Sequence, residues 1–200
     1  MPGKTLTGFL VVIEGIDGAG KTTQARLLAE KVQEMGFSVV SSREPTNGRW
    51  GKLLKESAKN GRLPPEEELN AFIEDRKEHV AGLIRPHLEN GRVVILDRYY
   101  FSTVAYQGAR GMNVQELMQM NEAFAPEPDL LIILDVEPEI GLRRIHQRGD
   151  DANQFELEAA LAKAREIFNQ IEKPYLLRLD AGQEPETIRD SIIEKFKQIT

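Results

Sequence analysis

The sequence predicts an α/β fold in three layers, in which a parallel β-sheet lies between two layers of helices. The first observation behind this prediction is that short runs of apolar and β-branched residues recur along the chain of 200 residues. The second is that segments with apolar residues at helical spacing lie between these runs. Strands that alternate with helices in this way are typical of parallel sheets.

The strands are expected at residues 9–14, 37–42, 92–97 and 129–135, with a weaker fifth at 175–180. The first, third and fourth of these runs are nearly continuous in apolarity, and apolar and polar residues do not alternate along them. A strand that is covered by helices on both of its faces has this pattern. The runs therefore belong in a parallel sheet.

The helices are expected at residues 22–35, 65–89, 114–124, 138–148, 156–172 and 185–198. In the first of them, apolar residues recur at helical spacing, and Gly36 provides a stop before the second strand. In the second, the same period continues until Asn90 and Gly91 end it. Proline stands in the first turn of the helices expected at 138–148 and 185–198, where its missing N–H costs nothing.

The polar, glycine-containing stretch 146–154 between two expected helices is the best candidate for a mobile segment. We therefore expect one domain over residues 1–200, with a small mobile lid at about 144–156. The 40% of apolar residues suffice for one sizeable core.

Composition narrows the class of protein. The chain has 26 basic and 32 acidic residues, a net charge of −6, which argues against a sequence-independent grip on nucleic acid or on an anionic membrane. The absence of cysteine excludes disulfides and thiolate zinc sites and fits a reducing compartment. The apolar run near the N-terminus is too short for a signal sequence or a membrane span. We expect a cytoplasmic protein that binds neither nucleic acid nor membrane.

The strongest motif is a complete G-x-x-x-x-G-K-T, which follows the first strand directly and precedes the first helix. It consists of Gly15, Ile16, Asp17, Gly18, Ala19, Gly20, Lys21 and Thr22. Glycines let the backbone direct N–H groups at phosphates, and the helix that follows offers the positive end of its dipole. Lys21 would neutralise the β and γ phosphates, and the Thr22 hydroxyl would ligate Mg²⁺. The motif predicts a P-loop NTPase fold that binds ATP.

A P-loop alone does not identify the reaction. The base-reading motif N-K-x-D of GTPase switches and the L-S-G-G-Q motif of transport ATPases are both absent. Instead, Asp97 and Arg98 end the third expected strand, and the carboxyl ends of parallel strands open onto the ligand crevice. Asp97 would then lie near the metal and Arg98 near phosphate. A turn carboxylate and a solvated arginine would be the alternative reading of this pair.

Three further segments carry weaker signals. Arg43 and Pro45 follow the second expected strand, where Arg43 could clamp an acceptor phosphate, although an ordinary polar loop is the commoner explanation. Phe72 and Arg76 emerge one turn apart on one helix face and could meet a base, but spacing alone favours a core Phe72 and a surface Arg76. The aromatic segment after Arg98 could be ordinary packing.

The three histidines show no metal-ligand grouping and are interpreted as incidental.

These pieces, in this order, resemble the thymidylate kinase family. The resemblance runs through IEGIDGAGKTTQ, REP, the DR pair on the long helix, DRYYFSTVAYQGARG, PDLLIILDV and PEIGLRR, which is nearly the whole chain. It implies a five-stranded parallel sheet, a homodimer, and Mg²⁺-dependent transfer of a phosphoryl group from ATP to dTMP, giving dTDP for dTTP biosynthesis.

The resemblance also assigns residues. It implies that ATP is held by the P-loop residues above together with Thr23 and Arg144, and that Mg²⁺ is held by Thr22 and Asp97. For dTMP it implies nine residues: Asp17 at the 3′-hydroxyl, Arg43 and Arg98 at the phosphate, Pro45, Phe72 and Arg76 around the base, Ser102 and Gln107 at the base, and Tyr106 beneath the sugar. These matches reverse the preference for a merely structural Phe72 and Arg76.

Members of this family supply an extra catalytic arginine from the P-loop or from the lid. The P-loop interior here contains no arginine, so the lid is expected to supply it. Arg144 and Arg148 lie four residues apart on the helix that leads into the lid, and Arg148 is the first choice, with Lys21 and Arg98 completing the catalytic set. An exposed arginine-rich helix face is the alternative.

Two other functions remain open at this point. The chain could be another (deoxy)nucleoside monophosphate kinase or a deoxynucleoside kinase on the same scaffold, or a non-catalytic nucleotide-binding module. Only the acceptor pocket separates the first of these from a dTMP kinase.

Overall fold

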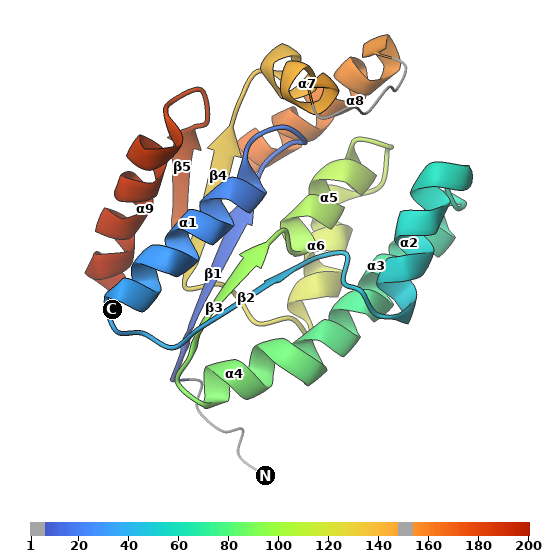
Figure 1. Ribbon diagram of the computed structural model, residues 1–200. Coiled ribbons are helices and arrows are strands. Elements are labelled where there is room, and N and C mark those ends of the chain that lie inside the picture. The colour runs from blue at the N-terminus through green and yellow to red at the C-terminus, as the bar shows by residue number, and fades with distance from the viewer. Residues whose placement is uncertain (1–6, 148–153) are drawn as a thin grey trace.

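The sheet of the computed structural model, which describes residues 7–147 and 154–200, has five parallel strands in the order β2-β3-β1-β4-β5 (Figure 1). The strands are β1 (Phe9–Glu14), β2 (Val39–Arg43), β3 (Val93–Asp97), β4 (Leu130–Asp135) and β5 (Leu176–Asp180). This confirms the predicted parallel α/β fold and each of its five strands.

The centre of the sheet explains why three strands read as continuous apolar runs. In β1, Val12 pairs with Leu96 of β3 on one side and with Leu131 of β4 on the other. All three side chains are fully buried. Because both faces of these strands are covered, polar residues have no solvent-facing position to occupy. The core therefore centres on β1, β3 and β4.

Helices connect the strands. They are α1 (Lys21–Glu34), α2 (Arg49–Asn60), α3 (Pro65–His79), the π-helical turn η1 (Val80–Ile84), α4 (Arg85–Glu89), α5 (Tyr100–Gly108), α6 (Val114–Glu122), α7 (Pro138–His146), α8 (Gln154–Gln170) and α9 (Pro185–Ile199). Figure 1 shows α1 and α9 on one face of the sheet and α3, α4 and α5 on the other, while α7 and α8 lie near the upper end of the strands.

Two helices were not predicted. In α2, Trp50, Leu53 and Leu54 lie at helical spacing on one face, a signal that the sequence analysis passed over. Helix α5 gives no such signal, because its side chains are apolar or aromatic nearly all round and most of them are buried. It therefore lacks the one-sided apolar stripe on which a helix prediction depends.

The long helix expected at 65–89 is continuous, but it is not α-helical throughout. After α3, the turn at Val80–Ile84 is π-helical, and α4 follows at Arg85. The extra residue in such a turn changes which side chains face the sheet, and π-helical turns are frequent beside functional sites. The residues on α3 just before this turn support the cavity described below.

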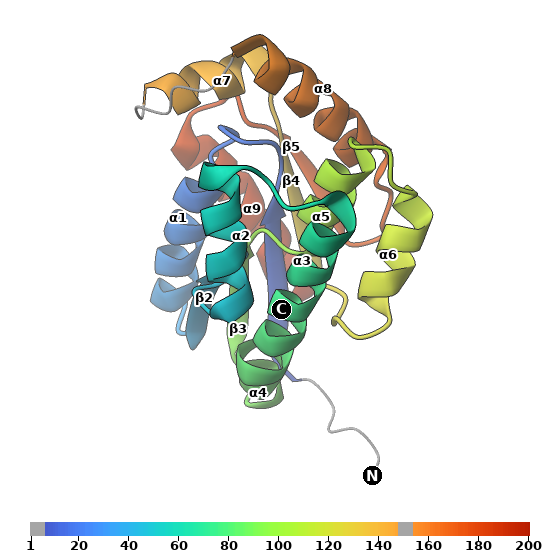
Figure 2. The same cartoon turned by 90° about the vertical axis from the view of Figure 1, so that its right-hand side faces the viewer.

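The carboxyl ends of the parallel strands meet at one edge of the sheet. Figure 2 shows the loop between β1 and α1 at this edge, below α7 and α8, with α2 and α3 side by side in front. Of the expected lid, residues 144–146 form the end of α7, Gln147 is its C-cap residue, and residues 154–156 begin α8, whereas Arg148 lies outside the described residues. Among the described residues, none of the helices is long and apolar enough to span a membrane.

Candidate active site

The P-loop connects β1 to α1 and surrounds a cavity of about 130 Å³. Gly15, Gly18 and Gly20 have φ angles of 138°, 83° and 93°, which residues with a Cβ rarely adopt. A Cβ on Gly18 would also collide with the backbone of Gly141 in α7. The glycines are thus required both by the turn itself and by the close packing of α7, and the loop ends at the N-terminus of α1.

Lys21 folds back over this loop. Its Nζ donates hydrogen bonds to the carbonyl oxygens of Gly15 at 3.0 Å and Ile16 at 2.7 Å, and the residue is 5% exposed. Burial and then the charge of Arg98 lower the pKa of Lys21 to about 8, although nearby carboxylates oppose this shift. The carboxylates are those of Asp17, Asp97 and Glu14. A phosphate group in the cavity would therefore meet a cation with little hydration to lose.

Thr22 and Asp97 form an oxygen-rich pair beside the P-loop. The Thr22 hydroxyl donates to Asp97 Oδ2 at 2.5 Å. Asp97 Oδ1 is buried and has no hydrogen-bond partner within the described chain. A hydroxyl and an unsatisfied carboxylate oxygen are ligands of the kind Mg²⁺ prefers, and this cation keeps most of its remaining positions for water and substrate phosphates. No group of three or more acidic, histidine or cysteine residues suited to a metal occurs in the described segments.

Arg98 lies between the P-loop and the next cavity. Its guanidinium forms an ion pair with Asp17 and donates to Ser102 Oγ at 3.2 Å. Burial would lower the pKa of Arg98, but Asp17 and other nearby groups raise it above its ordinary value, so the side chain stays cationic. Its backbone is in the left-handed region, with φ at 74°, which is uncommon for a residue with a side chain and concentrates at functional sites.

Asp17 joins the P-loop to Tyr106 of α5. The Tyr106 hydroxyl donates to Asp17 Oδ2 at 3.1 Å and accepts from the Asp17 backbone N–H at 3.0 Å. Burial alone would raise the pKa of Asp17, but the charges of Arg98 and Lys21 outweigh it and lower the pKa to about 2. Asp17 is thus an ionised acceptor at the boundary between the two cavities.

The second cavity has a volume of about 310 Å³ and is walled by α3, α5 and α8. Seven of the nine residues predicted to bind dTMP line it: Asp17, Pro45, Phe72, Arg76, Arg98, Ser102 and Tyr106. Its wall also contains residues that the sequence analysis missed, namely Glu44, Arg62, Tyr99, Thr103, Leu157, Ala160 and Leu161. The structure thus brings together segments from five separate parts of the chain.

The other two predicted residues lie elsewhere. Arg43 is exposed and lines the P-loop cavity and a neighbouring groove of about 660 Å³ between α1 and β2. Gln107 is fully buried, and its amide donates to Glu68 Oε2 at 2.8 Å. The structure places Gln107 behind the cavity, among the contacts between α3 and α5. The segment that contains Gln107 shows no helical period, so the sequence could not indicate whether this polar side chain is exposed or buried.

Arg76 is 1% exposed, so the spacing-only expectation of a surface arginine is wrong. Its Nε and Nη2 donate to Glu44 Oε2 at 2.9 and 2.6 Å, Nη2 also donates to Thr103 Oγ1 at 3.1 Å, and Nη1 donates to Asn121 Oδ1 at 2.5 Å. Within residues 7–147 and 154–200, four of its five N–H groups have acceptors, which leaves one on Nη1.

His79 completes the network behind Arg76. Its Nδ1 lies 3.0 Å from Glu44 Oε1, and its Nε2 lies 2.8 Å from Ser42 Oγ. Because a carboxylate only accepts hydrogen bonds, Nδ1 carries the proton that faces Glu44. The interpretation of His79 as incidental is therefore wrong, since it fixes the carboxylate that orients Arg76.

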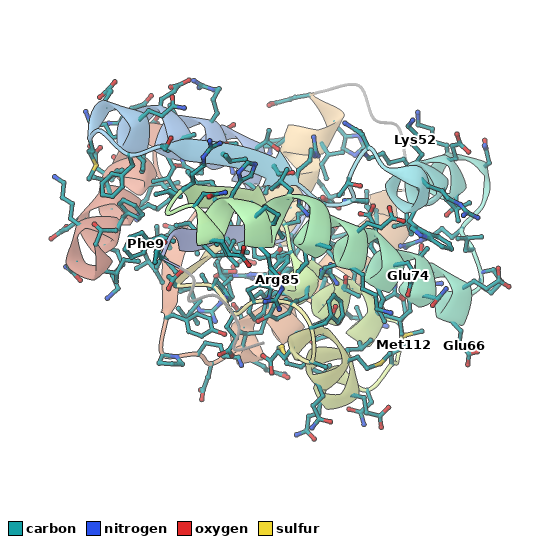
Figure 3. All side chains as sticks on the ribbon, turned by 90° about the horizontal axis from the view of Figure 1, so that it is seen from below. Phe9, Lys52, Glu66, Glu74, Arg85 and Met112 are labelled. Atoms are coloured by element: carbon teal, nitrogen blue, oxygen red, sulfur yellow. The ribbon has the colours of Figure 1, made fainter. Side chains whose placement is uncertain are left out.

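We expect Glu44→Gln to destabilise the protein by about 3 kcal/mol, because it leaves the Arg76 cation buried without its counterion. Chemical denaturation monitored by circular dichroism would measure the change. The matched control is Glu74→Gln on the same helix as Arg76 (Figure 3), where the partner is the exposed Lys77 at 2.7 Å. A surface pair of this kind contributes at most about 1 kcal/mol. Equal effects of the two substitutions would contradict a buried, charge-dependent role for Glu44.

Arg144 of α7 lies over the P-loop. Its guanidinium donates to the carbonyl oxygens of Gly18 at 3.3 Å and Ala181 at 2.9 Å. It thereby joins the P-loop to the loop that follows β5. Arg148, the first choice for the catalytic arginine, cannot be placed in this way because it lies outside the described residues.

The family model for thymidylate kinase matches residues 13–192. The chain belongs to the thymidylate kinase family. It is 53% identical over 181 residues to a thymidylate kinase of Xylella fastidiosa strain M12, covering 90% of this chain and 83% of that protein. It is 53% identical over 191 residues to that of strain 9a5c, with 96% and 91% covered. The thymidylate kinase of Xanthomonas campestris pv. campestris strain B100 is 49% identical over 181 residues, with 90% and 79% covered. These relatives confirm the resemblance inferred from the motifs.

Proposed function

We propose that this protein transfers the γ-phosphoryl group of ATP to dTMP and releases ADP and dTDP. The observation that carries the proposal is the position of Arg98, which lines both the P-loop cavity and the 310 Å³ cavity beside it. Transfer between two anionic nucleotides requires a cation at the boundary of the two binding sites. The family to which the chain belongs supports dTMP as the acceptor.

On the donor side, the backbone N–H groups of Gly15–Thr22 and the N-terminus of α1 would hold the phosphates of ATP, with Thr23 next along the helix. Lys21 would leave the carbonyl oxygens it now contacts and neutralise the β and γ phosphates. Arg144, already bound to Gly18 and Ala181, would cover the nucleotide from the α7 side. Thr22 and Asp97 would hold Mg²⁺, which neutralises phosphate charge when it is bound.

On the acceptor side, Arg98 and Arg43 would bind the phosphate of dTMP, and Asp17 would accept a hydrogen bond from the 3′-hydroxyl. Tyr106 would lie beneath the sugar, where its hydroxyl is fixed by two hydrogen bonds to Asp17. The acceptor phosphate is already a nucleophile, so no strong general base is required. Positioning and charge neutralisation would account for the rate.

The base would lie against Phe72 and Pro45, with Ser102 at its edge and Gln107 behind. Arg76 has one N–H group left on Nη1, which suits a single hydrogen bond to a carbonyl oxygen of the base. Because its other four N–H groups are held by protein, this donor is oriented before the substrate binds. Preorganisation of this kind lowers the entropy cost of binding.

We further propose that residues 1–200 act as one kinase domain with a lid at about 144–156, and that the lid supplies Arg148 to the transferring phosphoryl group. By family membership we also propose a homodimer in the cytoplasm. Size-exclusion chromatography with light scattering would test the oligomeric state.

The acceptor is tested by offering dTMP, dUMP, dCMP, dGMP and thymidine in turn with ATP and Mg²⁺ and measuring ADP release. We expect the highest kcat/KM for dTMP, because the 310 Å³ cavity combines one oriented donor with an aromatic wall. A clear preference for another monophosphate or for thymidine would overturn the acceptor. ATP binding without ADP release for any acceptor would identify a non-catalytic binding module.

A further inference from the structure

Glu14 is a buried carboxylate to which the mechanism above gives no role. It ends β1, directly before the first P-loop glycine, and its relative exposure is 0%. Its Oε1 accepts hydrogen bonds from the backbone N–H groups of Tyr99 at 2.8 Å and Ser102 at 3.0 Å. Its Oε2 accepts from the Ser102 hydroxyl at 2.6 Å. A carboxylate next to the donor site is thus bonded entirely to the acceptor wall.

The two N–H groups that Glu14 binds belong to the first turn of α5. Tyr99 is the N-cap residue of this helix, and Ser102 is its third helical residue. The N–H groups of a first turn have no partner four residues back in the helix, and α5 has no side-chain cap of its own. Within the described residues, the Ser102 N–H has only a 3.2 Å contact with the carbonyl oxygen of Tyr99 in addition to Glu14. Glu14 supplies this cap from another strand, and its negative charge faces the positive end of the helix dipole.

This cap governs the direction of the Ser102 hydroxyl. Because the hydroxyl donates its proton to Glu14, its lone pairs remain to accept from Arg98 Nη1 at 3.2 Å. Arg98 in turn has an uncommon left-handed backbone just before the capped turn. One carboxylate therefore fixes both the start of α5 and the polar atoms of two residues proposed to hold dTMP.

We infer that Glu14 is a positioning residue that orients Ser102 and Arg98 toward the acceptor nucleotide. It also holds the start of α5, which forms one wall of the acceptor cavity, in a fixed position relative to the P-loop. The inference rests on the proposed function, since it assumes that the 310 Å³ cavity binds the thymidine part of dTMP. Glu14 touches no substrate and acts only through these two residues.

The charge state of Glu14 provides a way to test this. Burial raises the pKa of Glu14 to about 7, although hydrogen bonds from Ser102 and Tyr99 and the charge of Arg98 oppose the shift. In the described part of the chain Lys21 is a further charged group near it, and Glu14 in turn raises the pKa of Lys21. Above pH 7 the carboxylate accepts the Ser102 proton. Below pH 7 the neutral acid donates to Ser102 Oγ instead, so the Ser102 hydroxyl proton turns away from Glu14 and Arg98 has only one of the two lone pairs of this oxygen left to it.

Glu14→Gln reproduces the protonated form at every pH. The glutamine oxygen can still accept from the two backbone N–H groups, so α5 keeps its cap, but the amide N–H must donate to Ser102 Oγ. The substitution therefore separates the orientation of Ser102 and Arg98 from the stability of the helix.

The experiment measures the Kd of thymidine by calorimetry from pH 5.5 to 8.5, because thymidine has no phosphate to titrate. We expect Glu14→Gln to weaken thymidine about tenfold at pH 8, the effect of one hydrogen bond to a charged group. We expect the wild-type Kd to rise as pH falls through about 7 and to approach the flat profile of the variant. Equal Kd values at pH 8, or parallel pH profiles, would overturn the inference.

Turnover provides the second readout. In Glu14→Gln, kcat/KM for dTMP should fall about tenfold while the KM of ATP changes less than about twofold. Equal losses toward both substrates would indicate a general structural defect and overturn the inference. Glu116→Gln is the control, because Glu116 is an exposed carboxylate in the first turn of α6 and should leave both unchanged.

Two further measurements test whether Glu14 acts through Ser102. In a Ser102→Ala background the effect of Glu14→Gln on thymidine should largely disappear, and full additivity would contradict the coupling. If Glu14→Gln does not fold, the wild-type pH profile compared with that of Ser102→Ala decides the same question. If the wild type does not phosphorylate dTMP, the proposed function fails, whereas the thymidine measurement still decides the role of Glu14.

Discussion

Lys21→Met is expected to lower kcat on the order of 10³-fold or more. Lys21 is buried beside the cavity and is held against two P-loop carbonyl oxygens until a nucleotide arrives. Methionine has a similar length but cannot neutralise the charge that develops between the β and γ phosphates. Because the surroundings exclude water, the lost interaction is strong. Steady-state kinetics with saturating ATP and dTMP would measure the loss.

The control for this substitution is Lys52→Met, which removes an exposed lysine of α2 (Figure 3) and should leave kcat within about twofold. Circular dichroism would verify that both variants fold. Turnover of Lys21→Met within tenfold of the wild type would contradict the proposed donor site.

Arg148→Ala is expected to lower kcat by a similar factor, on the order of 10³, while ATP affinity changes much less. The P-loop interior contains no arginine, and Arg144 is engaged with two backbone carbonyl oxygens. An arginine that reaches the transferring group only when the site is assembled acts on the transition state and not on ground-state binding. Single-turnover kinetics together with calorimetric titration of ATP would separate the two effects.

Arg189→Ala on α9 is the control for Arg148, because Arg189 is paired with its neighbour Asp190 and is not part of the described cavities. Near-normal turnover of Arg148→Ala would show that another cation carries out this step. Arg143, Arg144 and Arg49 would then be replaced in turn.

The strands could be predicted from the sequence because burial on both faces imposes a continuous apolar run, as in Phe9–Glu14 and Leu130–Asp135. The P-loop could be predicted because its glycines satisfy a local backbone requirement that few other residues meet. In both cases the structural requirement leaves a pattern within a short run of residues. Helix α5 could not be predicted, because side chains that are apolar and buried nearly all round leave no helical period in the sequence.

The residues of the candidate site also differ in whether the sequence could predict their positions. Asp17, Arg98 and Lys21 follow strand ends or the P-loop, so their positions could be derived from the topology of a parallel sheet. The supporting carboxylates Glu14 and Glu44 have no such signal. Their roles depend on contacts with residues 88 and 32 positions away, Ser102 and Arg76. A single sequence contains no record of contacts over that distance.

The most direct test of phosphoryl transfer to dTMP follows the phosphorus atom itself. The wild-type protein is incubated with ATP labelled with ³²P in the γ position, Mg²⁺ and dTMP, and the nucleotides are separated by chromatography. We predict that the label moves from ATP to dTDP, and that Lys21→Met shows almost no transfer in the same time. Label that stays in ATP, or that appears as inorganic phosphate whether or not dTMP is present, would contradict the account.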